Sequence, residues 1–134
     1  MGTHPYDEAI DFKTVHADLV TMKELKREKR LLIENVRWRP DKPNRKGRYL
    51  KEIYQMIKDY PRVGICYDVA HGYINREPME EIIKYKDRIQ HFHITDTRGR
   101  EDLHLPIGQG ELKWSRFFEI LAEIDYRGFL IIEK

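Results

Sequence analysis

The stretch IQHFHITDTRGREDLHLPIGQGE, residues 89–111, begins as a short apolar run and ends as a loop crowded with histidine, aspartate and glycine. Its apolar part, residues 89–95, has the length and the Ile- and Phe-rich composition of a strand buried on both faces. Three further runs share this composition, and they cover residues 31–36, 63–69 and 128–133. The sequence therefore predicts four buried strands.

Amphipathic segments separate these runs, with apolar residues spaced three and four apart. The predicted helices cover residues 11–29, 46–58, 78–87 and 112–124. The last of them is expected to face the core through Trp114, Phe117, Phe118 and Leu121. Such alternation of strands and helices implies parallel strands joined by right-handed crossovers, and hence an α/β fold. The basic stretch at 37–48 contains proline and glycine and is predicted to be a loop.

Composition limits the class of protein. The chain of 134 residues suits a single domain over residues 1–134. Its 25 Lys and Arg against 23 Asp and Glu give a net charge of +2, so nucleic acid is not expected as a partner. The one cysteine, Cys66, excludes an intrachain disulfide and is expected to pack in the core. Without a signal-peptide pattern or an apolar run of ~20 residues, the expectation is a cytoplasmic protein without membrane contact.

Each predicted strand carries a polar residue at or near its carboxyl end. In chain order these residues are Glu34, Asp68, His93 and Glu133. The carboxyl ends of parallel strands open on one face, so the four side chains are expected to converge. Three neighbouring carboxylates raise one another's pKa, and a divalent cation removes that cost. Three oxygens and one imidazole nitrogen suit Mn²⁺, Mg²⁺ or Co²⁺, with Zn²⁺ also acceptable.

A second group of polar residues surrounds this predicted metal site. His71 follows the second acid by three residues, and Asp102 and His104 form an i, i+2 pair. These three residues are interpreted either as ligands of a second metal or as a site for substrate hydroxyls or phosphate. Between them, Arg98 and Arg100 offer charge for an anionic group, and the PIGQG segment allows a ligand to approach the backbone closely.

The ordered set Glu, Asp-x-x-His, His, Asp-x-His, Glu resembles the xylose isomerase-like TIM barrels. It lies within LLIENV, DVAH, HFHITD, DLHLPIGQGE and GFLIIE. That superfamily contains sugar isomerases and epimerases and AP endonuclease IV. The resemblance implies a partial barrel, with about four to five parallel strands corresponding to strands three to seven, whereas a whole barrel has eight strands in ~250 residues. Because open sheet edges invite pairing, a homo-oligomer such as a dimer is expected to cover them.

The resemblance also implies roles for individual residues. In the isomerases and epimerases, one metal is bound at the positions of Glu34, Asp68, His93 and Glu133. The two glutamates there form the acid/base pair, and the position of His71 touches substrate. In the endonuclease branch the same four positions hold one zinc, and Glu34 is shared towards another. There, His71, Asp102 and His104 match ligands of a third zinc, and His4 resembles a further zinc ligand.

Three functional hypotheses follow. The first is a metal-dependent isomerase or epimerase that acts on a small sugar, sugar phosphate or keto-polyol through an enediolate. In it Glu34 and Glu133 transfer the proton, while His71 and Arg98 orient the substrate and Arg100 adds charge. The second is a zinc-dependent phosphodiesterase like endonuclease IV, and the third is a non-catalytic remnant of a barrel.

Several of these residues also have an ordinary structural interpretation. Asp68 alone suits a strand-to-loop turn. For His91 the favoured interpretation is a hydrogen-bonded histidine of the core. His104 is interpreted equally as a ligand or as part of the loop structure, and Arg98 and Arg100 also fit solvated loop charges.

Overall fold

The computed structural model describes residues 31–133, so the predicted helix over 11–29 and His4 lie outside the described residues. Over this range the protein forms a sheet of four parallel strands in the order β1-β2-β3-β4. These are β1 (Leu31–Glu34), β2 (Val63–Asp68), β3 (Ile89–Ile94) and β4 (Phe129–Ile132). Each lies within a predicted apolar run, which confirms the parallel α/β prediction.

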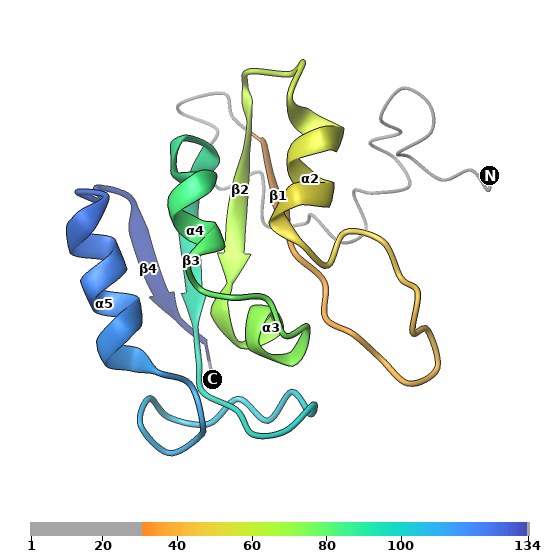
Figure 1. Cartoon of the computed structure of the whole chain (residues 1–134), viewed down its shortest axis with the longest axis vertical. Coiled ribbons are helices and arrows are strands. Elements are labelled where there is room, and N and C mark those ends of the chain that lie inside the picture. Colours follow the sequence, from red (N-terminus) through yellow and green to blue (C-terminus); the bar gives the residue numbers. More distant parts are fainter. Residues whose placement is uncertain (1–30, 134) are drawn as a thin grey trace.

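The helices cover one face of this sheet (Figure 1). They are α2 (Leu50–Ile57), α3 (Val69–Ile74), α4 (Glu81–Lys84) and α5 (Trp114–Glu123). The single helix predicted over 78–87 is divided into α4 and the 3₁₀ helix η2 (Lys86–Arg88). Helix α3 was not predicted, because its apolar sequence VAHGYI continues the composition of β2. Within residues 31–133 none of the helices combines the length and apolarity that crossing a bilayer requires.

The hydrophobic core lies between the sheet and the helices. At its centre the Phe92 ring meets those of Phe117 and Tyr126 edge-on, with centroids 5.2 and 4.9 Å away. Trp114 and Phe117 on α5 are buried as predicted. The same prediction is wrong for Phe118, which is 44% exposed, because it lies at the flank of the apolar helix face and meets the core only with the edge it presents to Trp114 and Phe117.

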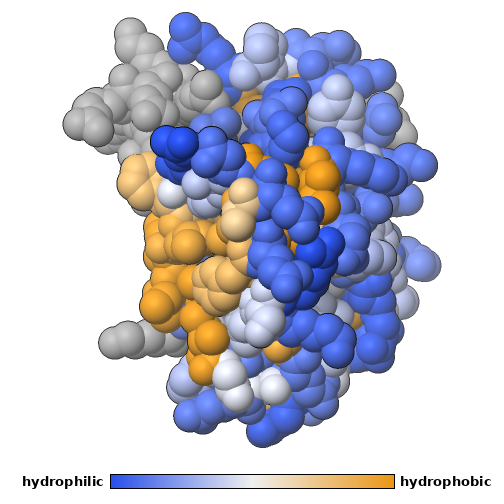
Figure 2. Space-filling view, turned by 60° about the vertical axis from the view of Figure 1, so that its left-hand side comes forward, coloured by the Kyte–Doolittle hydropathy of each residue, from blue (hydrophilic) through white to orange (hydrophobic). Residues whose placement is uncertain are grey.

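Strand β4 departs from the predicted burial on both faces. The exposed fractions of Phe129, Leu130, Ile131 and Ile132 are 58%, 42%, 39% and 64%. The strand pairs with β3 on one side only, and no described segment lies beyond its other edge. Figure 2 shows an apolar surface on the side of the molecule that carries β4. This edge of the sheet is therefore built like an interior strand but left uncovered by the described residues.

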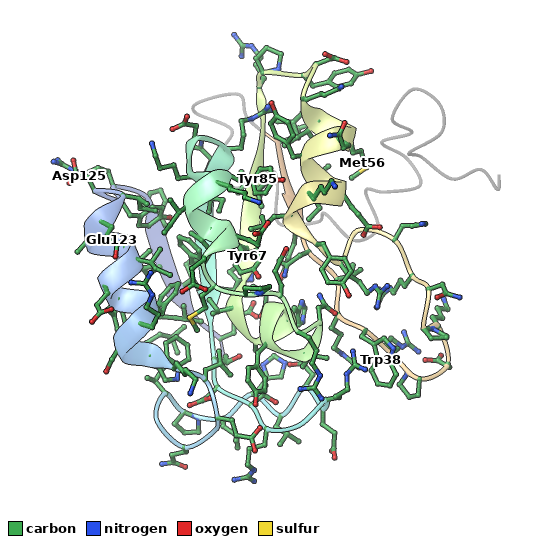
Figure 3. The ribbon with its side chains drawn as sticks, in the orientation of Figure 1. Trp38, Met56, Tyr67, Tyr85, Glu123 and Asp125 are labelled. Carbon is green, nitrogen blue, oxygen red and sulfur yellow. The ribbon has the colours of Figure 1, made fainter. Side chains whose placement is uncertain are left out.

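A buried hydrogen-bond chain joins β2 to α2 on the helical side. The hydroxyl of Tyr67, labelled near the middle of Figure 3, donates to Glu77 Oε1 at 2.8 Å. Glu77 Oε2 accepts from the backbone N–H of Leu50 at 3.0 Å, so it satisfies a donor of the first turn of α2. Burial raises the pKa of Glu77 to about 7, even though both hydrogen bonds act to lower it.

Asp96 organises the glycine-rich loop that follows β3. Its buried carboxylate accepts hydrogen bonds from the Trp114 indole N–H and from several backbone N–H groups. These are the backbone donors of Thr97, Gly108, Gly110 and Leu112. A side chain at Gly110 would collide with this carboxylate, and Gly108 has a φ of 95° that favours glycine. The PIGQG segment therefore wraps around Asp96, and its glycines serve the loop geometry.

Candidate metal centre

Four polar side chains converge at the carboxyl end of the sheet. Glu34 ends β1, Asp68 ends β2, His93 lies near the end of β3, and Glu133 directly follows β4. The strand register places Asp68 opposite His93, and side-chain alternation turns all four residues to the face away from the helices. One potential ligand atom from each of them lies within 4.8 Å of the others. The structure thus brings together the four residues that the sequence suggested as one metal site.

His93 lies between the two glutamates of this set. Its Nδ1 is 3.2 Å from Glu34 Oε2 and 3.2 Å from Glu133 Oε2. Burial acts to lower the pKa of His93, but the hydrogen bond to Glu34 and the charges of Glu34, Glu133 and Asp68 outweigh burial, so the pKa is raised. The carboxylates around His93 therefore favour its protonated form.

Asp68 serves the backbone as well as the set. Its Oδ1 accepts from the backbone N–H of His71 at 3.0 Å and so caps α3. The Asn35 amide holds the same residue, because its Oδ1 accepts from Asp68 N–H at 2.7 Å and its Nδ2 donates to Asp68 C=O at 3.1 Å. Burial raises the pKa of Asp68 to about 6, with Glu34 and Asp102 adding to the rise and His71 opposing it.

Asn35 links the two groups of polar residues, and the sequence pattern does not predict this position. Asn35 is fully buried. Its side-chain amide holds Asp68, and its backbone carbonyl oxygen lies 2.8 Å from His71 Nδ1. If this nitrogen donates, His71 Nε2 is left to face Asp102 Oδ2 at 3.4 Å and Asp68 Oδ2 at 3.5 Å. The only signal in the sequence is one asparagine inside an apolar run, which gives no hint of its partners.

The second group converges on Asp102. Its Oδ2 is 3.4 Å from His71 Nε2, 3.4 Å from His104 Nε2 and 3.6 Å from Arg37 Nε. Burial acts to raise the pKa of Asp102, but the hydrogen bond to His71 and the attraction of its basic neighbours outweigh burial, so the pKa is lowered. Its Oδ1 is buried without a hydrogen-bond partner. That oxygen is an acceptor ready for a cation or for a donor of a bound ligand.

The two arginines lie outside the four-residue set. Arg100 stacks over the Trp38 ring at 3.8 Å and donates from Nε to the Ile74 carbonyl oxygen at 3.2 Å. Figure 3 labels Trp38 in the loop after β1, and this residue, Arg100 and Asp102 line an open hollow beside the second group. Arg98 is exposed, and its Nη1 is 3.5 Å from the Gln109 carbonyl oxygen. Of the two, only Arg100 borders the site.

The donor chemistry of the strand-end set fits a divalent cation. Three carboxylates and one imidazole supply hard oxygen ligands and one nitrogen, and His93 is the one basic side chain that contacts both glutamates among the described residues. Oxygen-rich sets of this kind suit Mn²⁺, Mg²⁺ or Co²⁺. Glu34, Asp68, His93 and Glu133 are therefore the residues that would hold the ion.

The buried acids and His71 predict how the metal-free protein responds to pH. The folded pKa of Asp68 is raised from 3.8 to about 6, that of Glu77 from 4.5 to about 7, and that of His71 from 6.5 to about 9. Each group binds its proton more tightly in the folded than in the unfolded protein. Its contribution to folding stability is therefore complete at low pH and is lost as the pH rises through the pKa of the folded protein. Chelator-treated protein should therefore require less urea to unfold at about pH 9 than at about pH 5.

A pair of variants tests how much of this pH dependence of the urea midpoint comes from Glu77. Glu77→Gln removes one of the three groups, so the fall in urea midpoint between about pH 5 and about pH 7 should become shallower. Glu123→Gln, an exposed residue of α5 labelled in Figure 3, provides the matched control and should keep the wild-type slope. A midpoint that rises steadily across this range would contradict the assignment.

Comparisons with known proteins identify the family of the chain. The family described as "Xylose isomerase-like TIM barrel" matches residues 3–134. The "Probable endonuclease 4" of Aster yellows witches'-broom phytoplasma is 29% identical over the whole chain, which covers 49% of that relative. The "Fructoselysine 3-epimerase" of Escherichia coli O157:H7 is 28% identical over 54% of the chain and 27% of the relative.

Among solved structures, the crystal structure of a D-tagatose 3-epimerase-like protein superimposes with a TM-score of 0.68 and 28% identity. The superposition covers 78% of this chain and 40% of the epimerase-like chain. The chain thus spans about half or less of the length of these relatives. By the family match over nearly its whole length, the chain belongs to the xylose isomerase-like TIM barrel family.

Proposed function

We propose that the chain carries the metal and proton-transfer residues of a sugar isomerase or epimerase. The observation that supports this most directly is the position of the two glutamates. Glu34 and Glu133 come from the outer strands β1 and β4, and their carboxylates meet at the same nitrogen of His93. Two carboxylates that approach one site from opposite sides suit a reaction in which one takes a proton and the other returns it.

A divalent cation held by the set would polarise a carbonyl oxygen and a neighbouring hydroxyl of the substrate. One glutamate carboxylate takes the proton from the carbon beside that carbonyl, which gives the enediolate form of the sugar. The other glutamate returns a proton to carbon: return to the opposite face of the same carbon gives the epimer, and return to the former carbonyl carbon, with transfer of the hydroxyl proton to the former carbonyl oxygen, gives the isomer. Asp68 and His93 complete the ligand set, and Asn35 keeps Asp68 in place through two hydrogen bonds.

Substrate would lie over the strand ends, beside the second group. His71, fixed by the Asn35 carbonyl and by carboxylates on its other nitrogen, is placed to contact a sugar hydroxyl. Arg100 borders the adjoining hollow and would favour a phosphate or another anionic substituent there. The resulting substrate class is a small keto sugar or sugar phosphate.

Replacing a single glutamate tests the proton-transfer role. With Mn²⁺ present, Glu133→Gln should reduce turnover of a ketohexose by at least about a hundredfold, because the amide cannot accept the proton. Conversion is followed by NMR over a panel of ketohexoses and their phosphates, and Mn²⁺ binding is measured separately by calorimetry. Circular dichroism establishes that the variant keeps the fold.

Glu123→Gln makes the same chemical change on the exposed face of α5 and should leave turnover unaltered. Turnover by Glu133→Gln at the wild-type rate would remove Glu133 from the mechanism. Failure of the wild-type chain to bind any of Mn²⁺, Mg²⁺, Co²⁺ or Zn²⁺ would favour the non-catalytic remnant.

A second candidate is zinc-dependent phosphodiester cleavage. It is favoured by the convergence of His71 and His104 on Asp102, whose buried Oδ1 lacks a partner, and by the match of the whole chain to about half of a probable endonuclease 4. Metal counting separates the two candidates. Elemental analysis of zinc-saturated protein should give one ion fewer for His104→Asn than for wild type if the second group binds zinc. Equal zinc content in the two proteins would rule out zinc binding by the second group, and only the isomerase proposal would remain.

We also propose that a second copy of the chain covers the apolar edge at β4. The four described strands are half of the eight that close a barrel of this family. A two-fold axis along the barrel direction would place β4 of one copy beside β1 of the other, with all strands parallel. This arrangement pairs the backbone groups of β4 and buries its exposed side chains.

Light scattering should therefore give twice the chain mass. Ile132→Lys places a charge on the most exposed residue of β4 and should shift the protein towards monomer at low concentration. Leu103→Lys changes another exposed apolar residue, in the loop after β3, and should keep the dimer. A wild-type chain that stays monomeric and soluble at high concentration would contradict the proposal.

A further inference from the structure

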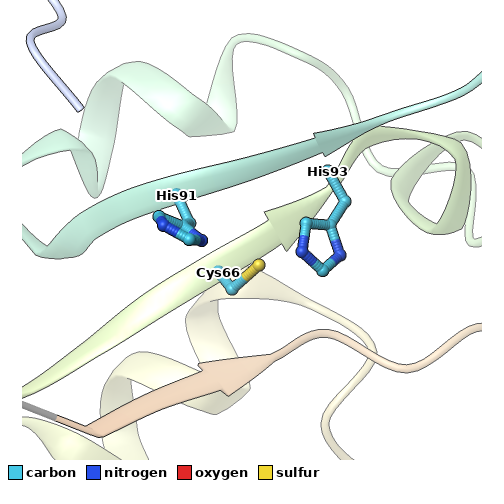
Figure 4. A group of neighbouring side chains, drawn as sticks. All are labelled: Cys66, His91 and His93. Carbon is cyan, nitrogen blue, oxygen red and sulfur yellow. The ribbon is translucent and has the colours of Figure 1, made fainter. Parts of the chain in front are cut away.

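A cluster of soft ligands lies next to the carboxylate set, one step down the sheet. Cys66 on β2 and His91 and His93 on β3 each offer one ligand atom, and these three atoms lie within 4.8 Å of one another. Figure 4 shows the three side chains on the same side of the two strands. Their exposed fractions are 0%, 6% and 4%, so the cluster is almost closed to solvent.

A local irregularity of the sheet creates this cluster. The β2–β3 register pairs Ile65 with Ile89 but Cys66 with His91, so Gln90 is passed over. Without this bulge Cys66 would lie opposite Gln90. Beyond the bulge the regular alternation places His93 on the same face as His91. The backbone thus aligns the thiol with two imidazoles in a way that regular pairing would not.

The chemistry of the cluster differs from that of the carboxylate set. One thiolate and two imidazoles form a soft to borderline donor set, which prefers Zn²⁺, Co²⁺ or Cu⁺ to Mn²⁺ or Mg²⁺. Three protein ligands leave one tetrahedral position open. The side of His91 away from the other ligands is shielded by the Phe129 ring, whose centroid is 5.0 Å from that of His91. Such apolar shielding favours the binding of a soft, weakly hydrated ion.

We propose that Cys66, His91 and His93 form a distinct site for a thiophilic metal ion, and that this site competes with the carboxylate set for His93. His93 belongs to both groups, and in the structure its Nδ1 is directed at Glu34 and Glu133. Metal binding at the cysteine removes the thiol proton and draws on the same imidazole. A thiophilic ion therefore displaces Mn²⁺ and acts as an inhibitor of the carboxylate set. This competition rests on the proposed role of that set, whereas the cysteine site itself does not.

Cobalt spectroscopy tests the site without any assay of activity. The chain contains a single cysteine, so a thiolate-to-cobalt charge-transfer band in the near ultraviolet can arise only from Cys66. Titration of metal-free protein with Co²⁺ should produce this band, saturating at one ion per chain. Cys66→Ser and Cys66→Ala should abolish it. His91→Asn and His91→Gln should weaken the affinity by at least about tenfold, since losing even an outer-shell partner of a ligand has that effect.

His104→Asn is the matched histidine control, because His104 contacts Asp102 and is not part of the cluster. It should leave the charge-transfer band unchanged. Absence of the band at saturating Co²⁺ both in wild type and in Glu34→Gln, whose carboxylate set is weakened, would overturn the site. A band of equal affinity in both folded His91 variants would overturn the ligand assignment.

Competition is tested by a second readout. Protein loaded with Mn²⁺ is titrated anaerobically with Cu⁺, and the release of Mn²⁺ is followed by electron paramagnetic resonance. Wild type should release Mn²⁺ as Cu⁺ binds, whereas Cys66→Ala should retain it, because carboxylates bind Cu⁺ weakly. Simultaneous binding of both ions by wild type would overturn the competition, because it would show that the two ring nitrogens of His93 serve both sites at once. If the protein binds no Mn²⁺ but shows the cobalt band, the proposed function fails and the cysteine site stands.

Discussion

Mutual repulsion of three carboxylates around one imidazole is the constraint on which the rest of this structure depends. Glu34 and Asp68 end their strands and Glu133 directly follows β4, so three carboxylates share one rim of the sheet, where each makes it costlier to charge the others. His93 lies among them, and its Nδ1 is 3.2 Å from a carboxylate oxygen of each glutamate. The strand register places Asp68 opposite His93, and the two hydrogen bonds of the Asn35 amide hold Asp68 there, so these groups stay close together.

Three aspartates at the same rim show how surroundings decide what a carboxylate does. Asp96 accepts hydrogen bonds along the loop after β3, and the donors hold its pKa low, so it acts as a structural anchor. Asp102 is paired on one oxygen and unpaired on the other, which leaves room for a ligand. Asp68 is buried with like charges nearby, and its pKa is raised to about 6, so it favours a proton or a cation. The residue type is the same, and the number of available donors separates the roles.

The two faces of the sheet have different partners. Towards the helices, β2 and β3 bury Tyr67 and Phe92 in an aromatic and aliphatic core. On the other face, tiers of polar ligands follow one another: Cys66 and His91 on one rung, then Asp68 and His93 on the next. In a closed barrel of this family that second face is the interior. On β4, Phe129 and Ile131 continue this interior surface, whereas Leu130 and Ile132 lie on the face of Phe92, towards the helices.

The sequence by itself was sufficient for the four strands, their parallel arrangement and the gathering of the four strand-end residues. Strand periodicity and the common direction of parallel strands decide these features without knowledge of distant contacts. Only the tertiary structure decided the exposure of β4 and Phe118, because exposure depends on which neighbours are present. The same holds for Asn35 and Asp96, whose partners lie 33 and up to 18 residues away along the chain. The alignment of Cys66 with His91 depends on a one-residue shift in strand pairing, and such a shift is set by how the strands pack and leaves no mark in either strand's own pattern.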